Sequence, residues 1–343
     1  MLNRIWRSRG ALSSALLPLA LIFTLLAAVR RAFYRYGLLR TQRLPVPVVV
    51  VGNIVAGGSG KTPLVLWLAQ ELSQRGWRPG IVSRGYGGTV DKNRELAEVS
   101  SNSDPAVVGD EPLLLKRRAG LPVFVGRNRV AVGRAMLDAY PDCNLVLSDD
   151  GLQHYRLARD VEIAVIDVRG LMNGWPLPAG PLREPAARLA QVDALVLNAA
   201  SPPIFSGSGQ IPCFRMSLAG EVFYRLDQPA QTNTAAALAT AYPRLHAVAG
   251  IGEPRRFFEH LAALGLAFTP YAFADHHRYR ATDLVFADCD ALLMTEKDAV
   301  KCAGLIASAG SAFPVIWVLP VAAELEPDLA AFVVEKLNGP PSA

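Results

Sequence analysis

The sequence predicts an α/β protein with a three-layer α/β/α domain on a parallel sheet, a smaller α/β domain and an apolar N-terminal helix. Three observations support this. Short apolar runs alternate with helical patterns from residue 46 onward, which is typical of a parallel sheet covered on both faces. A glycine-rich turn joins the first run to a helix, and nineteen uncharged residues precede both. The 343-residue chain is also long enough for two domains with separate cores.

Residues 1–43 are expected to associate with a membrane. They contain eight arginines and no acidic residue, and the uncharged stretch from Ala11 to Val29 is about long enough to span a hydrocarbon core. Removing these eight charges from the net charge of +5 leaves about −3 on the other 300 residues. The folded body is therefore not expected to bind nucleic acid, whereas the basic segment suits an anionic membrane surface.

This apolar segment has four possible interpretations. A cleaved signal peptide fits poorly because Arg30 and Arg31 would follow any cleavage site, and a spanning helix should show a clearer charge asymmetry. A buried core helix would leave the basic flanks unexplained. A helix embedded in one leaflet, with its arginines on lipid phosphates, fits both flanks. Pro18 is a candidate kink position.

Residues 44–200 are expected to form the larger domain, with Gly76 ending its first helix. The predicted strands are Val46–Val51, Gly80–Ser83, Val123–Val125, Leu145–Ser148, Glu162–Asp167 and Ala194–Asn198, and the predicted helices are Thr62–Arg75, Glu111–Arg118 and Asn128–Tyr140. The four cysteines form no CxxC pair and are expected to be reduced, buried thiols of a cytosolic protein.

Residues 201–240 break the alternation and are expected to link the domains. Within them, "CFRMSL" and "EVFYRL" are predicted to form a short two-stranded hairpin around Ala219-Gly220. Residues 241–343 are expected to form the smaller α/β domain. Its predicted elements are strands Leu245–Ala249, Ala291–Met294 and Pro314–Leu319 and helices Glu253–Leu264 and Asp298–Ala307.

The glycine-rich turn is predicted to bind a nucleotide. It reads Val55-Ala56-Gly57-Gly58-Ser59-Gly60-Lys61-Thr62, whereas the phosphate-loop (P-loop) pattern G-x-x-x-x-G-K-[ST] has glycine at the first position. Backbone N–H groups of the glycines and the start of the following helix can still converge on a phosphate. We expect all eight residues to bind ATP, with Lys61 reaching the β- and γ-phosphates and Thr62 ligating Mg²⁺. A glycine-rich turn without a ligand would not explain this order of strand, glycines, Lys-Thr and helix.

Carboxylates and histidines supply the other candidate groups. Asp149 and Asp150 end an apolar strand on the ligand-binding side of a parallel sheet and are predicted to hold the metal, although a simple turn is the alternative. Asp110 lies at a loop-to-helix junction, where capping is the ordinary explanation and catalysis would need a partner. Histidines are few: His154 follows the aspartate pair, and the second domain offers His276 and His277. An Asp–His pair drawn from two domains could deprotonate a hydroxyl group.

An ordered series of motifs resembles the tetraacyldisaccharide 4′-kinase family of lipid A biosynthesis. It comprises "GNIVAGGSGKTP", "SRGYGG", "GDEP", "DDGLQH", "PAGPLREP", "DHH" and "TEKDAVK", in that order over most of the chain. The resemblance implies ATP-dependent phosphorylation of the 4′-hydroxyl of a tetraacyldisaccharide 1-phosphate, giving lipid IVA, at the cytoplasmic face of the bacterial inner membrane. It also implies two α/β/α domains hinged by a short β linker. No obligate protein partner is expected, and the family generally lacks the first glycine.

The resemblance implies roles for individual residues. Asp110 would be the base and His276 its partner, chosen over His277 because it directly follows the aspartate. Asp149 and Asp150 would be the metal and phosphate acids. The expected substrate-binding residues are Tyr86, Gln153, His154, Arg183 and Glu184. The alternative function is a membrane-attached ATPase switch that recruits a partner protein; Ala56 counts against it because some such ATPases have lysine there.

Overall fold

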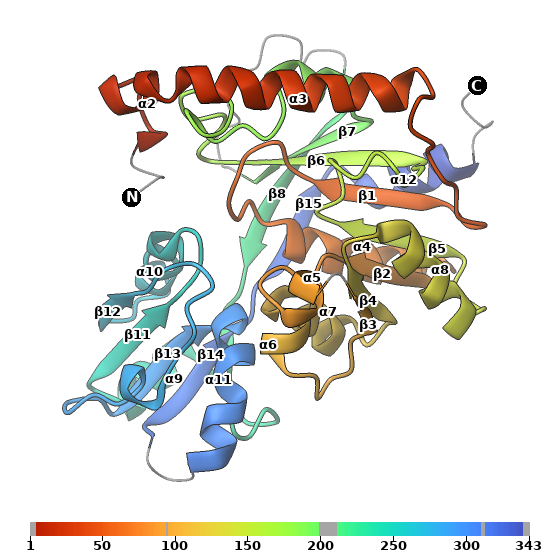
Figure 1. The fold of residues 1–343 in the computed structure, drawn as a ribbon. Coiled ribbons are helices and arrows are strands. Elements are labelled where there is room, and N and C mark those ends of the chain that lie inside the picture. Colours follow the sequence, from red (N-terminus) through yellow and green to blue (C-terminus); the bar gives the residue numbers. More distant parts are fainter. Residues whose placement is uncertain (1–4, 94, 199–210, 310–312, 339–343) are drawn as a thin grey trace.

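Two β-sheets organise the chain, and a long helix lies along the outer side of the larger one (Figure 1). The computed structural model describes residues 5–93, 95–198, 211–309 and 313–338. Most of the predicted strands and helices lie within two residues of their expected bounds. The predicted α/β class with parallel sheets is confirmed.

The larger sheet has nine strands in the spatial order β15-β8-β7-β6-β1-β5-β2-β4-β3. β3 and β15, at its two edges, run antiparallel to their neighbours, whereas the other strands are parallel. The bounds are β1 Val48–Gly52, β2 Pro79–Ser83, β3 Leu96–Glu98, β4 Val123–Gly126, β5 Leu145–Asp149, β6 Val161–Asp167, β7 Ala194–Asn198, β8 Cys213–Ala219 and β15 Ala322–Glu326.

Helices cover both faces of this sheet because its central strands are apolar on both sides. Val49 and Val51 of β1 pack in one core with side chains of α4, α7 and α12, and Val48 and Val50 pack in the other with α8. The helices of this domain are α4 Lys61–Gln74, α5 Thr89–Asn93, α6 Pro105–Val108, α7 Asp110–Ala119, α8 Arg129–Ala139 and α12 Leu329–Asn338, with a 3₁₀ turn η1 at Ala186–Gln191. Gly76 follows α4 with a φ of 87°, as expected of a residue that ends a helix.

The smaller sheet has six strands in the order β10-β9-β14-β13-β11-β12. Helices α9 and α10 contribute to the core on one face and α11 to the core on the other. The bounds are β9 Val222–Arg225, β10 Thr232–Thr234, β11 Leu245–Ala249, β12 Phe268–Ala272, β13 Ala291–Thr295, β14 Val315–Leu319, α9 Ala235–Ala241, α10 Pro254–Ala263, α11 Glu296–Ala309 and the 3₁₀ turn η3 Ala281–Asp283.

The predicted hairpin between the domains is wrong. β8 pairs with β7 and β15 in the larger sheet, whereas β9 pairs with β10 and β14 in the smaller one. Their apolar side chains belong to different cores, Phe214 to the larger domain and Phe223 to the smaller. Cys213, expected to be buried, is exposed on β8. The first part of the predicted linker, residues 201–210, lies outside the described residues.

The chain instead crosses between the domains twice, and the expected boundary of the C-terminal domain is wrong at its end. After β14 the chain returns, so that β15 pairs with β8 and α12 packs against the larger sheet, with Val333 in its core. A Cβ atom on Gly220 would lie 2.2 Å from the carbonyl oxygen of Pro320. The two crossings therefore pass each other so closely that only glycine fits at this point.

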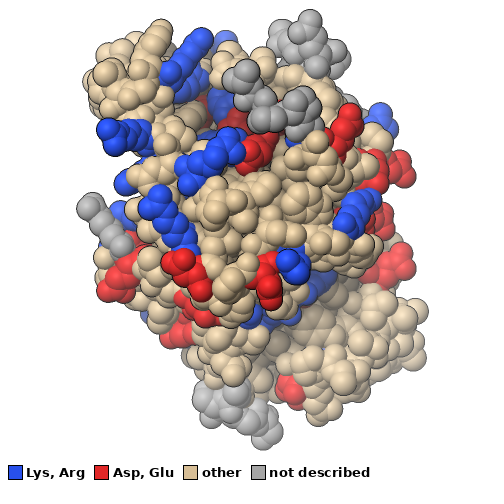
Figure 2. Space-filling model, turned by 90° about the vertical axis from the view of Figure 1, so that its right-hand side faces the viewer, with Lys and Arg blue, Asp and Glu red and all other residues tan. Residues whose placement is uncertain are grey.

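The N-terminal segment forms two helices, α2 Ala11–Ala15 and α3 Leu17–Arg35. The apolar segment is interrupted at Leu16, and Pro18 lies in the first turn of α3, where proline is tolerated. The break thus falls two residues before the candidate kink position. Within the described residues α3 is the one helix long and apolar enough to cross a membrane, and only 6% of its most apolar window is buried. The hypothesis of a buried core helix is therefore wrong. Figure 2 shows Lys and Arg side chains gathered at the upper left of one face, at the level of α3 in Figure 1.

Candidate active site

The phosphate loop connects β1 to α4, and glycine provides the backbone conformations that it needs. Gly57 and Gly60 have φ values of 102° and 88°, a region that other residues rarely adopt. A Cβ atom on Gly60 would lie 2.4 Å from Nδ2 of Asn198. These turns make Lys61 the first residue of α4, at a helix end that attracts anions.

Three side chains fix the loop from outside. Asn53 donates through Nδ2 to Oγ of Ser59 at 3.1 Å, and Asn198 donates to the carbonyl oxygen of Ser59 at 3.0 Å. Arg169 donates through Nη2 to the carbonyl oxygen of Gly58 at 2.6 Å. Carbonyl oxygens that would repel a phosphate are thus occupied by donors, and these contacts fix the conformation of the loop.

Val55 and Ala56 have a different role from the rest of the predicted ATP-binding set. The N–H of Ala56 donates to the carbonyl oxygen of Pro181 at 2.8 Å, and Val55 forms an antiparallel bridge with Leu182. Val55 is also buried, with 4% of its surface exposed. The loop tolerates the missing first glycine because this position pairs with another strand segment and needs no glycine conformation.

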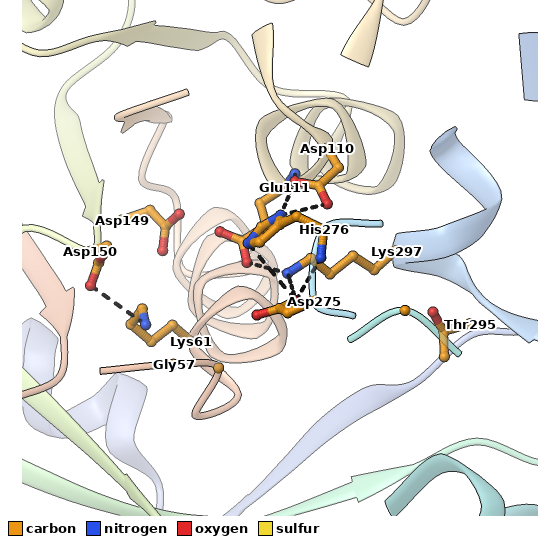
Figure 3. Close-up of polar contacts among 12 residues, drawn as sticks. Gly57, Lys61, Asp110, Glu111, Asp149, Asp150, Asp275, His276, Thr295 and Lys297 are labelled. Atoms are coloured by element: carbon orange, nitrogen blue, oxygen red, sulfur yellow. Dashed lines mark hydrogen bonds and ion pairs between the residues drawn. The ribbon is translucent and has the colours of Figure 1, made fainter. Parts of the chain in front are cut away.

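Lys61, Asp150 and Arg183 form a charged cluster beside the loop, and Figure 3 shows the contact between Lys61 and Asp150. Nζ of Lys61 lies 3.5 Å from Oδ1 of Asp150, and Nη1 of Arg183 donates to both oxygens of Asp150 at 2.9 and 3.1 Å. Burial alone would raise the pKa of Asp150, but Lys61 and Arg183 outweigh it and hold that pKa well below its usual range. Asp150 is thus occupied by cationic side chains, and it holds Lys61 close to the loop.

Asp149 is the better candidate for a metal ligand. It is buried, its Oδ2 accepts from the hydroxyl of Ser83 at 3.1 Å, and its Oδ1 has no hydrogen-bond partner among the described residues. Burial, together with the nearby charges of Glu111 and Asp150, raises the pKa of Asp149 to about 7. A divalent cation would satisfy the free oxygen and favour the ionised carboxylate. These features fit a magnesium ion held by Asp149 and by Thr62 in the first turn of α4.

Asp110 and His276 come from different domains and meet at the domain interface (Figure 3). Nδ1 of His276 lies 3.1 Å and 3.0 Å from the two carboxylate oxygens of Asp110. Asp110 begins α7, and its side chain also accepts from the N–H of Glu111 at 3.0 Å. His277 turns away and pairs with Asp283 at 3.0 Å. Of the two adjacent histidines, the structure therefore brings His276 to the aspartate.

The Asp110–His276 contact shifts the pKa of each partner. The hydrogen bond to Asp110 raises the pKa of His276 above its ordinary value, against the effect of burial. Burial would raise the pKa of Asp110, but the hydrogen bond with His276 and the charge of Lys297 hold it below its usual value. The ring of Tyr86 lies with its centroid 5.4 Å from that of His276. The geometry allows the pair to accept and pass on a proton.

Two cavities adjoin the phosphate loop, and Gly58 and Lys61 line both of them. The larger, of about 950 Å³, is lined by α3 and by Lys61, Asp150 and His276. The five expected substrate-binding residues also line it: Tyr86, Gln153, His154, Arg183 and Glu184. The smaller, of about 290 Å³, lies between the domains and is lined by residues 58–62 of the loop and by apolar side chains such as Phe257 and Leu319.

Polar side chains that line the larger cavity are held in place. Glu184 accepts from the hydroxyl of Tyr155 at 2.8 Å and lies 3.3 Å from Arg188. Gln153 donates to the carbonyl oxygen of Asn53 at 3.1 Å. Burial lowers the pKa of His154 to about 3, so its imidazole is neutral at physiological pH.

Several interface residues had no role assigned from sequence. Asn198 and Arg169 support the loop although they lie far from it in the sequence. Lys297 of the "TEKD" motif contacts Glu111 across the interface and Asp275 within its own domain. In the sequence, Glu111 adjoins Asp110 and Asp275 adjoins His276, and this adjacency is the signal that could point to a role for the two carboxylates. It could not be used without knowing that the two segments meet.

The whole chain was compared with known proteins. The family model described as Tetraacyldisaccharide-1-P 4'-kinase matches residues 12–338. The chain belongs to the tetraacyldisaccharide 4′-kinase family. This confirms the resemblance that the motif series indicated, and it identifies the chain as a member of a family of lipid kinases.

Members of this family match over nearly the full chain. The Tetraacyldisaccharide 4'-kinase of Dechloromonas aromatica is 53% identical over 98% of this chain and 97% of its own, and that of Azoarcus sp. is 50% identical over 98% and 96%. The crystal structure of LpxK from Aquifex aeolicus in complex with ATP matches with a TM-score of 0.79 and 29% identity. That match covers 95% of this chain and 99% of the other. The fold of the family is therefore present throughout.

Proposed function

We propose that this protein transfers the γ-phosphate of ATP to the 4′-hydroxyl of a tetraacyldisaccharide 1-phosphate, giving lipid IVA. One observation carries the proposal: Gly58 and Lys61 of the phosphate loop line both the smaller cavity and the larger cavity walled by α3, and His276 lines the larger one. If the base of ATP occupied the small cavity, the terminal phosphate would lie past Lys61, toward the Asp110–His276 pair. The names of the relatives, tetraacyldisaccharide 4′-kinases, support this substrate.

The residues of the chain contribute alignment, charge neutralisation and proton removal. Lys61 and the loop N–H groups bind the phosphates, and Asp150 keeps Lys61 in position. Mg²⁺, held by Asp149 and Thr62, would supply charge neutralisation at the phosphate oxygens. The Asp110–His276 pair accepts the proton of the sugar hydroxyl. Tyr86, Gln153, His154, Arg183 and Glu184 would orient the sugar head group.

The proposed reaction takes place at a membrane surface, and α3 supports this location. Its exposed apolar side chains include Leu21, Leu25 and Leu26, which are 67%, 64% and 64% exposed. The same helix walls the larger cavity through Phe23 and Ala27. Acyl chains could therefore remain in the cytoplasmic leaflet of the inner membrane while the sugar enters the cavity.

Label transfer tests the proposal directly. The full-length protein is incubated with γ-³²P-ATP, Mg²⁺ and tetraacyldisaccharide 1-phosphate in detergent micelles, with Lys61→Ala as the matched control. Labelled lipid that depends on Lys61 supports the kinase. Free labelled phosphate with unlabelled lipid would contradict it and favour the ATPase switch.

A further inference from the structure

Lys297 occupies the centre of the contact between the two domains (Figure 3). Its ammonium group lies 2.8 Å from Oε1 of Glu111 in the larger domain and 3.4 Å from Oδ1 of Asp275 in the smaller. Only 17% of the Lys297 side chain is exposed. The ion pair to Glu111 is thus shielded from solvent and stronger than a surface pair.

The bridge made by Lys297 lies directly beside the Asp110–His276 pair. Glu111 follows Asp110 at the start of α7, and Asp275 precedes His276 in the loop after β12. The same two segments therefore meet twice, once through Asp110 and His276 and once through the shared ammonium group. A movement that breaks the second contact also displaces the first.

Lys297 itself is rigidly placed by the buried Asp298. The carboxylate of Asp298 accepts from the hydroxyl of Thr295 at 2.7 Å and from the N–H of Gly250 at 3.0 Å, and it pairs with Lys301 at 2.8 Å. These contacts tie the first turn of α11 to the end of β13 and to the loop after β11. Lys297 therefore projects from a fixed base toward the larger domain.

We propose that Lys297 is a positioning residue for phosphoryl transfer, whose ammonium group, shared by Glu111 and Asp275, holds the domains where Asp110 meets His276. This inference rests on the proposed kinase function. It gives "TEKD", whose residues Thr295, Glu296 and Lys297 also line the smaller cavity, a role in aligning the two domains. A second interdomain ion pair, between Arg118 and Glu296 at 2.6 Å, involves the residue just before Lys297 and contacts neither Asp110 nor His276.

The charge of Lys297 also acts on the pair that it positions. The groups that face His276 are Asp110 from α7, Asp275 from its own loop at 3.9 Å, the Tyr86 ring and Lys297 from α11. Lys297 lowers the pKa of His276 and of Asp110. Loss of this positive charge therefore raises the pKa of the pair. The pair is then free to accept a proton only at a higher pH.

Steady-state kinetics of Lys297→Met, Lys297→Arg and the matched control Arg118→Gln test the proposal. For Lys297→Met we expect kcat to fall about 10- to 100-fold, as for a small misplacement of reacting groups. Lys297 also lines the smaller cavity, so the KM of this variant for ATP is measured as well and should change less than kcat. The acidic limb of its pH–rate profile should move upward by about one unit. Lys297→Arg keeps the charge and should keep the wild-type profile. Arg118→Gln removes a cross-domain ion pair away from the catalytic pair and should also keep it.

The outcomes separate this inference from the proposed function. A Lys297→Met enzyme with wild-type kcat and an unmoved acidic limb would overturn the positioning role while leaving the kinase intact. A wild-type protein that labels no lipid would overturn the function itself. Thermal unfolding of each variant identifies loss of folding; if Lys297→Met is unfolded, Lys297→Gln is measured by the same criteria.

Discussion

Replacement of Asp110 by asparagine tests the proton-accepting pair without changing its shape. In the wild type the hydrogen bond to Asp110, with His276 Nδ1 3.0 and 3.1 Å from the two oxygens, raises the pKa of His276 above 6.5. Burial and Lys297 act in the opposite direction. Without the Asp110 charge these opposing effects remain, with only Asp275 still acting to raise the pKa, so the pKa of His276 should fall from its wild-type value.

Two consequences of Asp110→Asn follow for the rate. Loss of the general base should reduce kcat by about 10²- to 10⁴-fold, with nucleotide affinity near that of the wild type. Activity requires the deprotonated pair and therefore rises with pH through the pKa of His276. The acidic limb should accordingly lie at a lower pH in the residual activity of the variant than in the wild type.

The assay is the initial rate of lipid phosphorylation between about pH 5 and pH 9, where histidine titrates. The matched control is His277→Gln, because His277 pairs with Asp283 and not with Asp110. It should retain near-normal kcat and the wild-type profile. An Asp110→Asn enzyme that keeps both its turnover and its acidic limb would refute the reasoning.

Three further changes have defined outcomes. Val55→Gly introduces the common phosphate-loop glycine. It should lower the free energy of unfolding by about 2 kcal/mol, because a buried side chain is lost, and it should not raise kcat. Higher activity would contradict the account of this position. Gly60→Ala should weaken ATP binding measured by calorimetry, since its Cβ would lie 2.4 Å from Nδ2 of Asn198 at a φ of 88°; unchanged affinity would show that the loop relaxes. Deletion of residues 1–30 should move the protein from membranes to the soluble fraction, whereas high salt should release the full-length protein poorly because apolar burial holds it; ready release by salt would contradict an embedded helix.

Local patterns predicted most of the elements, and long-range pairing explains what they missed. The valine run of β1 and the glycines before Lys61 carry their own signals of strand and turn. By contrast, β8 and β9 are consecutive apolar strands that any local pattern would join as a hairpin. Their separation depends on β15, which is more than 100 residues away and pairs with β8.

The candidate site shows the same division. Asp149, Asp150 and Lys61 could be predicted as site residues because each lies at the end of a recognisable strand or helix or directly beside it. That Ala56 donates to Pro181 depends on a segment 125 residues away, and no local signal marks it. The bridge from Lys297 to Glu111 likewise depends on how two domains meet, and so it becomes visible only in three dimensions.

The most direct test of the account is the position of the new phosphate in the isolated product. The wild-type protein is incubated with unlabelled ATP, Mg²⁺ and tetraacyldisaccharide 1-phosphate, and the purified lipid is examined by mass spectrometry and ³¹P NMR. The account predicts a bisphosphorylated lipid whose second phosphate is a monoester on the 4′-oxygen. Unchanged monophosphate, or a second phosphate attached elsewhere, would contradict it.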